Sequence, residues 1–199
     1  MIITDDNGCA DTCSADLTVD DQPVCDITGD DAVCTGFTTE WCATAGMDTY
    51  AWTGPGGFTS DQQCITVGTG LTPGTHTYEV IITDESGCAD TCSADLTVND
   101  QPVCDITGDD AVCVGFTAEW CATAGMDTYA WTGPGGFTSS LQCITVGTGL
   151  APGTHTYEVI ITDASGCADT CSADLTVNDQ PVCDISGDDA VCVGFTTEW

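Results

Sequence analysis

The sequence predicts an all-β chain built from tandem sandwich domains, and three observations support this prediction. The chain of 199 residues repeats itself with a period of 79, because residues 22–100 and 101–179 align without a gap and differ at only six positions. Short segments alternate between apolar and polar residues, which is typical of half-buried strands, and none shows the periodicity of a helix. Glycine and proline separate these segments at short intervals, as turns between strands require.

The repeat divides the chain into four parts. Residues 22–100 and 101–179 are two complete repeats, residues 1–21 match the C-terminal part of a repeat, and residues 180–199 match the N-terminal part of one. The two end pieces together lack the equivalent of residues 42–79, so they do not complete a third repeat. We therefore expect the chain to be a window on a longer array, in which further copies of the same repeat are its partners.

One repeat has the pattern of about seven short strands. The clearest strands of the first complete repeat cover residues 24–28, 36–44, 49–53, 63–67, 75–83 and 91–98. A repeat of about eighty residues with strands at this spacing predicts an immunoglobulin-like β-sandwich. In such a fold Trp52 is the natural core tryptophan, and Tyr78 is the tyrosine near the start of the sixth strand.

Four segments of the sequence carry a resemblance to a known class of proteins. They are PVCDITGDDAVC, YAWTGPGGFT, GTHTYEVIITD and SGCADTCSADLTV. They resemble the tandem immunoglobulin-like or PKD-like repeats of giant bacterial surface and gliding-type adhesins. The resemblance covers the whole chain, and it implies a spacer role and an extracellular location, either on the bacterial cell surface or secreted.

Each complete repeat carries six cysteines, and a cysteine content this high is typical of a chain in an oxidising, extracellular compartment. Cys42 lies late in the second strand and Cys64 lies early in the fifth. These two strands are antiparallel neighbours in a sandwich, so the two Cβ atoms can approach to about 4 Å. We therefore predict the disulfides Cys42–Cys64 and Cys121–Cys143.

The other four cysteines of each repeat lie on the first and last strands, and their order alone does not determine how they pair. The resemblance implies Cys34–Cys88, which leaves Cys25 for Cys92. A parallel seam in register favours Cys25–Cys88 instead. That choice pairs Cys34 with Cys92. A link from one repeat to the next, such as Cys92–Cys104, is a further alternative. The corresponding cysteines of the second repeat are Cys104, Cys113, Cys167 and Cys171.

A zinc site is the alternative use of these cysteines, because the segment CADTC has two cysteines four residues apart. The repeat has no second pair of this kind, and His76 is distant in sequence. A catalytic thiol needs a nearby cation that lowers its pKa, and the chain has no Lys or Arg. His76 and His155 are single histidines on strands with no nucleophile tied to them by a motif. We therefore expect disulfides and no enzymatic activity.

The chain carries 32 acidic residues and a formal charge of −32. Nucleic acids and anionic membrane surfaces bind to basic patches, so neither is an expected partner. The apolar runs are only a few residues long, which predicts neither a membrane span nor a signal peptide within this window.

Acidic residues gather in the turns and linkers that such a sandwich places at one end. Several hard oxygen ligands with no competing cation are what Ca²⁺ prefers. We therefore hypothesise that calcium binds at the domain junctions and stiffens the array, whereas the alternative is that the acids only solvate the surface. The candidate ligands are Asp100, Asp105, Asp127, Asp163 and Asp169 at the junction of the two complete repeats, and Asp21, Asp26, Asp48, Asp84 and Asp90 at the junction before it.

Two functions follow from these predictions. The first is a structural extracellular fibre or surface stalk made of stacked, disulfide-stapled sandwiches. The second is a multivalent adhesin whose repeats bind an unknown surface ligand or glycan, with avidity from repetition. Its candidate loop is WTGPGGFT, with Trp52, Phe58, Trp131 and Phe137 near the surface, although core packing is the favoured interpretation of these aromatics. The loop is identical in both repeats, which favours the fibre because a ligand-binding loop is expected to vary.

Overall fold

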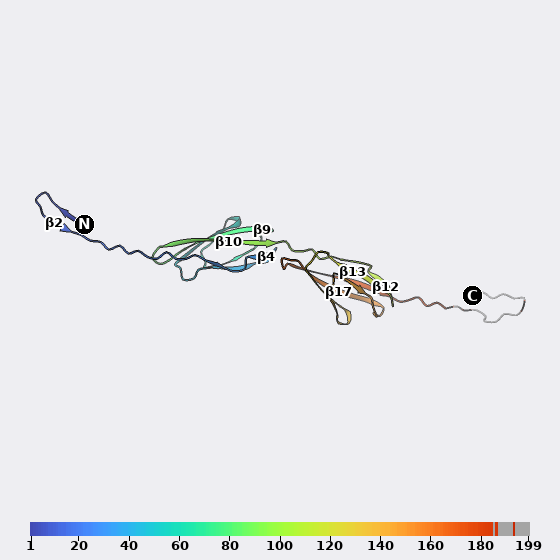
Figure 1. Ribbon diagram of the computed structural model, residues 1–199. Coiled ribbons are helices and arrows are strands. Elements are labelled where there is room, and N and C mark those ends of the chain that lie inside the picture. Colours follow the sequence, from blue (N-terminus) through green and yellow to red (C-terminus); the bar gives the residue numbers. More distant parts are fainter. Residues whose placement is uncertain (185, 187–192, 194–199) are drawn as a thin grey trace. The chain divides into compact units, whose positions relative to one another are not determined.

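The computed structural model describes residues 1–184, 186 and 193, and strands form nearly all of its regular structure (Figure 1). The chain divides into two compact units, Met1–Asp100 and Gln101–Trp199. The division falls between the two complete repeats of the sequence.

The elements recur in the same order in the two units. The first unit contains β1 (Ile2–Thr4), β2 (Ala10–Thr12), β3 (Ile27–Thr28), β4 (Ala32–Cys34), β5 (Thr39–Ala43), β6 (Thr49–Gly54), the 3₁₀ turn η1 (Pro55–Gly57), β7 (Phe58–Ser60), β8 (Cys64–Val67), β9 (Gly74–Thr83) and β10 (Ala89–Asn99). The second contains β11 (Ile106–Thr107), β12 (Ala111–Cys113), β13 (Ala118–Ala122), β14 (Thr128–Gly133), η2 (Pro134–Gly136), β15 (Phe137–Ser139), β16 (Cys143–Val146), β17 (Gly153–Thr162) and β18 (Ala168–Asn178).

Each complete repeat folds as a sandwich of two sheets. In the first unit the larger sheet has the order β4-β10-β9-β6-β7 and the smaller sheet has the order β3-β5-β8. Neighbouring strands are antiparallel except β4, which pairs in parallel with the C-terminal part of β10. The second unit repeats this topology with β12-β18-β17-β14-β15 and β11-β13-β16. The predicted fold class, an all-β chain of tandem immunoglobulin-like sandwiches, is therefore confirmed.

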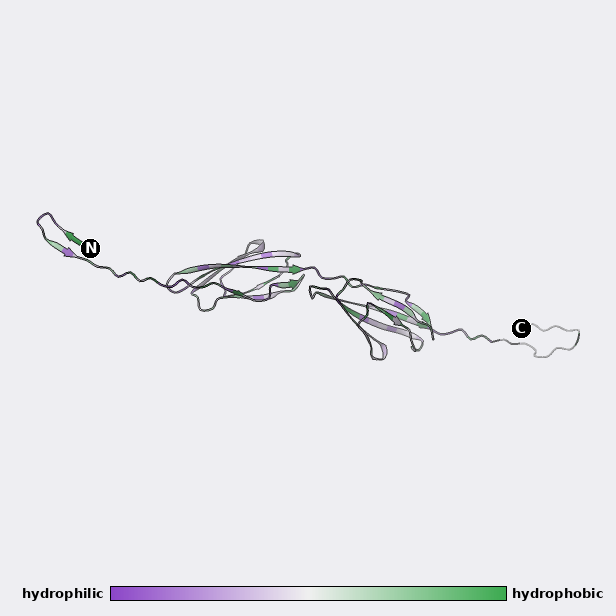
Figure 2. Ribbon diagram, in the orientation of Figure 1, coloured by the Kyte–Doolittle hydropathy of each residue, from purple (hydrophilic) through white to green (hydrophobic). Residues whose placement is uncertain are grey.

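The core of each sandwich is formed by the side chains that alternate inward along its strands, and apolar and polar positions alternate visibly in Figure 2. On β9 the residues Tyr78, Val80 and Ile82 are buried, and Thr77, Glu79 and Ile81, which alternate with them, are exposed. Trp41 from the smaller sheet and Trp52 from the larger sheet are each only 1% exposed. The predicted role of Trp52 as a core residue is thus confirmed. Each sandwich has its own hydrophobic cluster.

The first strand of the sandwich is split between the two sheets, which the sequence pattern did not reveal. β3 pairs with β5 in the smaller sheet, and after a short turn β4 pairs with β10 in the larger one. Gly29 lies at this crossing with a φ of +148°, and a Cβ atom there would overlap the Trp41 indole ring and the Glu40 carbonyl oxygen. Only glycine therefore fits at the crossing.

The end piece before the first complete repeat forms a hairpin. β1 and β2 are antiparallel, with Ile2 opposite Thr12, and Asp5 closes the turn by accepting hydrogen bonds from the N–H groups of Asn7 and Cys9 at 2.9 and 2.8 Å. In the described part of the chain, no helix is long and apolar enough to cross a membrane.

Candidate functional site

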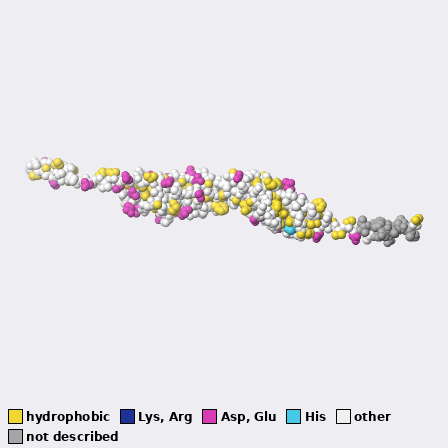
Figure 3. Space-filling view, turned by 60° about the horizontal axis from the view of Figure 1, so that its bottom comes forward, with side chains coloured by type: hydrophobic (Ala, Val, Ile, Leu, Met, Phe, Trp, Pro, Cys, Tyr) yellow, Lys and Arg dark blue, Asp and Glu magenta, His cyan; other side chains and the backbone are white. Residues whose placement is uncertain are grey.

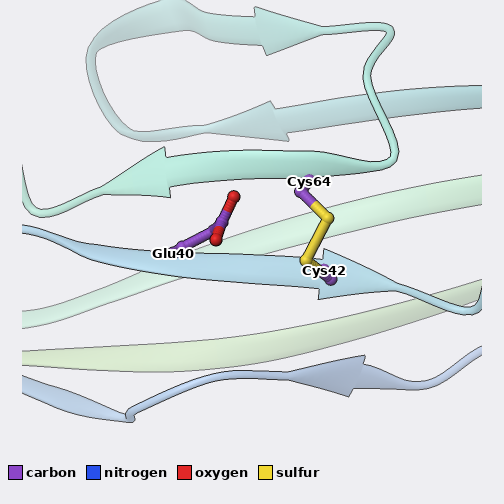
Figure 4. A group of neighbouring side chains, drawn as sticks. All are labelled: Glu40, Cys42 and Cys64. Atoms are coloured by element: carbon purple, nitrogen blue, oxygen red, sulfur yellow. A yellow bond between two sulfur atoms is a disulfide. The ribbon is translucent and has the colours of Figure 1, made fainter.

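The first disulfide of each repeat joins two neighbouring strands of the smaller sheet. Cys42 on β5 lies directly opposite Cys64 on β8, the Cα atoms are 4.0 Å apart, and the sulfur atoms are bonded (Figure 4). The neighbours of Cys42 along the strand, Trp41 and Ala43, point into the core. The bridge therefore lies on the outer face of the sheet. The second repeat forms Cys121–Cys143 in the same way, and both pairs are those expected from the strand order.

The second disulfide joins the beginning of the repeat to its last strand. Cys25, two residues before β3, is bonded to Cys92 on β10, with 5.5 Å between the Cα atoms and a sequence separation of 67. Cys92 lies on the core side of β10, and both cysteines pack against the hydrophobic cluster. The second repeat has the equivalent bridge Cys104–Cys171.

The predicted pair Cys34–Cys88 is wrong, because Cys88 is a free thiol. The parallel register explains why: Cys34 lies opposite Asn99, at the end of β10, whereas Cys88 precedes the first residue of this strand of 11 residues. At about 3.3 Å per residue the two positions are more than 30 Å apart along β10. The alternatives Cys25–Cys88, Cys34–Cys92 and Cys92–Cys104 are also wrong, since Cys25 and Cys92 bond to each other.

The equivalent cysteines of the second repeat follow the same register. Cys113 is an exposed free thiol, so Cys113–Cys167 does not form. Cys34 and Cys167 are themselves disulfide-bonded. Besides Cys88 and Cys113, the free cysteines among the described residues are Cys9, Cys13 and Cys183, all in the end pieces.

The Cys88 thiol lies in a half-buried, negatively charged setting. Partial burial raises the pKa of this thiol above its ordinary value, and the charges of Asp84 and Asp20 raise it further. The N–H of Cys88 donates to an Asp84 carboxylate oxygen at 2.9 Å, which holds the thiol beside that charge. Cys88 is therefore largely protonated, and only weakly nucleophilic, at neutral pH.

The acidic residues proposed for calcium in the first unit do lie at one end of the sandwich. Asp84 closes the turn from β9 to β10 by accepting from the N–H groups of Ser86 and Cys88, each at 2.9 Å. Asp90 accepts from the N–H of Cys25 at 2.8 Å, which ties the incoming chain to β10. Asp84 and Asp90 thus have structural roles.

The other three acids of this set flank the same end. The N–H of Asp48 donates to the carbonyl of Thr83, where β9 ends, and the N–H of Asp26 donates to the hydroxyl of Thr44. Asp21 precedes Gln22, whose side-chain amide donates to the first carbonyl of β10 at 2.9 Å.

In the second unit the equivalent acids behave in the same way. Asp163 closes the turn from β17 to β18. The N–H of Asp127 donates to the carbonyl of Thr162, and the N–H of Asp105 donates to the hydroxyl of Thr123. Asp100 directly precedes Gln101, whose side-chain amide donates to the carbonyl of Ala168, the first residue of β18.

Asp169 uses both carboxylate oxygens. One accepts from the N–H of Cys104 and the other from the N–H of Thr170, each at 2.8 Å. These two backbone hydrogen bonds lower the pKa of Asp169 below its ordinary value of 3.8. The charge at this position is therefore part of what holds the start of the second repeat on β18.

These carboxylates do not form a ready calcium cage. Among the described residues, the only groups of three acidic, Cys or His ligand atoms within 4.8 Å of one another are Glu40 with Cys42 and Cys64, and its counterpart Glu119 with Cys121 and Cys143. Figure 4 shows that the two sulfur atoms of the first group are bonded to each other, so they are not thiolates and do not bind a metal as such. Asp and Glu side chains otherwise lie spread over the visible face of both sandwiches (Figure 3).

In the WTGPGGFT segment Trp52 lies in the core and Phe58 is partly buried against it, so the expectation that these aromatics lie near the surface is wrong for Trp52, whereas Thr53, Gly56 and Gly57 are exposed. β6, η1 and β7 form a tight hairpin. Trp52 is buried, and its indole N–H donates to the carbonyl of Gln62 at 2.9 Å. Phe58 packs edge-to-face on buried Tyr78, with 5.6 Å between the ring centroids. Trp131 and Phe137 repeat these contacts in the second unit.

The single histidine of each repeat has a structural partner. Nε2 of His76 lies 2.7 Å from the carbonyl oxygen of Thr72, and Nε2 of His155 lies 2.8 Å from that of Ala151. Because a carbonyl only accepts, the imidazole donates in both cases.

Comparisons with known proteins found similarity to solved structures only. No protein-family model matches the sequence, and no curated protein matches it. Among solved structures, the fibronectin(III)-like modules of Clostridium thermocellum CbhA are 14% identical with a TM-score of 0.45, covering 77% of this chain and 94% of that chain. A two-domain fibronectin type III segment of chicken tenascin is 16% identical with a TM-score of 0.33, covering 76% and 98%. A 1.5-MDa bacterial ice-binding adhesin is 16% identical with a TM-score of 0.38, covering 80% and 67%. These similarities concern the fold alone.

Proposed function

We propose that this chain is part of an extracellular fibre or surface stalk, of a bacterium or secreted, whose repeats carry tension. The observation that supports this most is the bridge between Cys25 and Cys92, repeated as Cys104–Cys171. It connects the start of each repeat directly to the last strand. Ten disulfide-bonded cysteines among the described residues also favour an oxidising compartment.

The bridge gives tension a short covalent path through each repeat. Force applied at the ends of residues 22–100 enters three residues before Cys25 and leaves eight residues after Cys92. The intervening chain, with a sequence separation of 67, is bypassed even if the sandwich unfolds. At about 3.5 Å per extended residue, each bridge withholds about 230 Å of extension. A stalk made of such repeats keeps its length under load.

The smaller bridge is nested inside the larger one, and this allows a sharp test by single-molecule pulling. The background variant keeps the eight cysteines of the four bridges and has serine at all other cysteines. Replacing Cys42, Cys64, Cys121 and Cys143 by alanine is expected to leave the extension of the oxidised chain unchanged, because the larger loops remain closed.

Replacing Cys25, Cys92, Cys104 and Cys171 by alanine in the same background is expected to lengthen each unfolding step. The step should grow by about 160 Å, since only the loop of separation 22 stays closed. If the oxidised background protein extends as far as this variant, the load-bearing function is contradicted.

A multivalent adhesin is the second candidate, and one surface feature favours it. Phe37 and Phe116 occupy equivalent positions in the two repeats, and each is 60% exposed. An apolar ring presented at the same place in every repeat suits weak, repeated contacts. Binding of the chain to glycan arrays or bacterial surfaces, lost when both phenylalanines are changed to serine, would favour this function over the stalk. No binding to any surface in the panel would count against it.

Calcium binding at the N-terminal end of each sandwich is a separate proposal. Its support is the set of five aspartates at that end and the absence of Lys and Arg from the chain. Because no three of these carboxylates converge in the described structure, calcium would have to draw them together. We expect millimolar calcium to raise the melting temperature at constant ionic strength, and EGTA to reverse this.

Matched variants test where the calcium acts. Changing Asp26, Asp48, Asp105 and Asp127 to asparagine should abolish the calcium effect, whereas changing Asp61, which lies in the loop after β7, to asparagine should preserve it. An unchanged melting temperature and scattering profile in EGTA would contradict calcium binding by these aspartates.

A further inference from the structure

Two cysteine positions of each complete repeat are not part of the four bridges described above. They are Cys34 and Cys88 in the first repeat, and Cys113 and Cys167 in the second. They lie at opposite ends of the long last strand: Cys34 is in register with Asn99 at the end of β10, and Cys88 directly precedes its first residue. No rotamer change within one sandwich brings these positions together.

The chain enters each sandwich at the end that carries Cys88 and leaves it at the end that carries Cys34. The side-chain amide of Gln22, the first residue of the repeat, donates a hydrogen bond to the carbonyl of Ala89, the first residue of β10, beside Cys88. The N–H of Thr35 donates to the carbonyl of Asn99, one residue before the repeat ends, at 2.8 Å. Each sandwich therefore has one cysteine at the end where the chain enters it and one at the end where the chain leaves it.

A second, independent observation shows that both positions form disulfides. Cys34 and Cys167 are disulfide-bonded, whereas their sequence counterparts Cys113 and Cys88 are free. The two sandwiches have the same topology and nearly the same sequence. The fold of a single sandwich therefore does not determine whether the cysteine at each of these positions is disulfide-bonded or free.

We propose that Cys113 forms a disulfide with Cys88 of a second copy of this chain, so that the second sandwich of one copy is bonded to the first sandwich of the other. A covalent link suits these copies, because each carries a strong net negative charge and the chain has no Lys or Arg for ion pairs. The inference goes beyond the proposed stalk and needs only neighbouring copies and an oxidising compartment.

The reaction is a thiol–disulfide exchange with a small-molecule disulfide such as oxidised glutathione. The thiolate of Cys113 attacks one glutathione sulfur, which forms a mixed disulfide and releases one reduced glutathione. The thiolate of Cys88 from the second copy then attacks the Cys113 sulfur and releases the second glutathione. Two protein thiols are oxidised, one glutathione disulfide is reduced, and the two thiol protons pass to the two glutathione thiolates.

The test uses the full chain with serine at Cys9, Cys13, Cys183 and Cys192, so that the end pieces offer no competing thiol. The protein is incubated with oxidised and reduced glutathione at mildly alkaline pH, where Cys88 forms more thiolate. Products are separated on non-reducing gels and digested with a protease that cleaves at acidic residues. Cross-linked peptides are then identified by mass spectrometry.

Sequence differences make the linked cysteines identifiable. Glu85 distinguishes the Cys88 peptide from that of Cys167, and Val114 distinguishes the Cys113 peptide from that of Cys34. Random collision of two thiols per molecule gives about half Cys88–Cys113 links, with the rest divided between the two like pairs. We expect a ladder of oligomers in which nearly all links between molecules join Cys88 to Cys113.

Two control variants complete the design. Cys113→Ser and Cys88→Ser should each stop the ladder, and mixing the two should give dimers only. A random distribution of links, disulfide-bonded dimers of Cys113→Ser alone, or oxidation confined to monomers would each overturn the proposal. Because the pulling experiment uses a background without these cysteines, the proposed stalk and this cross-link can fail independently.

Discussion

Gly29 shows how one residue sets the path of the first strand. The chain leaves the smaller sheet after β3 and enters the larger sheet at β4, and the space beside Gly29 is filled by the indole of Trp41. That indole is held in turn, because its N–H donates to the carbonyl of Asp30 at 2.7 Å. The crossing therefore depends on a missing Cβ atom.

We predict that changing Gly29 and its counterpart Gly108 to alanine destabilises both sandwiches by about 1–3 kcal/mol beyond the backbone cost of a positive φ. The matched control is alanine at Gly36 and Gly115, which also have positive φ but have no atom within 4 Å of the added Cβ. Denaturant unfolding of the two double variants measures the difference. Equal unfolding midpoints would show that crowding by the tryptophan contributes nothing.

Asp169 gives the second unit a specific sensitivity to acid. Because its folded pKa lies below the ordinary 3.8, the charged carboxylate contributes stability above that ordinary value, and this contribution is lost as the pH falls through the lowered pKa. Asp169→Asn should lower the melting temperature at pH 7 and flatten its dependence on pH in the acid range, whereas Glu158→Gln, on an exposed position of β17, should leave the acid profile unchanged. Parallel acid profiles for Asp169→Asn and the unmodified chain would contradict this.

At the scale of the elements, the long strands and the core were predictable, and the position of β4 along β10 was not. β9 follows from its alternation, since Tyr78, Val80 and Ile82 all point inward. The partner of Cys42 also follows, because two antiparallel neighbours align it with Cys64. Cys25–Cys92 agrees with the pairing that the resemblance left, whereas the failure of Cys34–Cys88 depends on the offset of β4 along β10, which no local pattern encodes.

The acidic clusters illustrate the same limit. Their position at one end of the sandwich follows from the order of the turns. The hydrogen bonds that Asp84 and Asp90 accept depend on backbone geometry. The same turn nevertheless forms in the isolated hairpin, where the Asp5 carboxylate accepts from the N–H of Cys9, the first residue of the CADTC segment. That local recurrence is the signal that could have assigned these aspartates a structural role.

The two bridges of a repeat should differ in how much they stabilise it. In the chain-entropy model, closing a separation of 67 is worth about 4 kcal/mol and closing one of 22 about 3 kcal/mol. Removing Cys25–Cys92 and Cys104–Cys171 should therefore lower the free energy of unfolding by about 1 kcal/mol more per repeat than removing Cys42–Cys64 and Cys121–Cys143. Urea unfolding of the two alanine variants under oxidising conditions tests this order. The reverse order would indicate that strain or packing outweighs loop closure.

For the whole molecule, the formal charge of −32 with no Lys or Arg is the dominant electrostatic fact. Every long-range charge interaction within a sandwich is repulsive, and salt reduces the range of this repulsion from about 30 Å at 0.01 M to about 8 Å at 0.15 M. We predict that the melting temperature rises steadily with sodium or potassium chloride. A chain of balanced charge would show little change. A melting temperature that falls with salt would contradict net repulsion as the controlling term.

The bridge from Cys25 to Cys92 also constrains the order of events during biosynthesis. In the unfolded chain Cys92 is only twelve residues from Cys104 of the next repeat, whereas Cys25 is 67 residues away. Loop closure alone favours the wrong, nearer partner by about tenfold. Correct oxidation therefore requires that a sandwich assembles, or that an isomerase corrects its thiols, before its successor is oxidised. An array of near-identical repeats is thus best matured one repeat at a time, from its N-terminus.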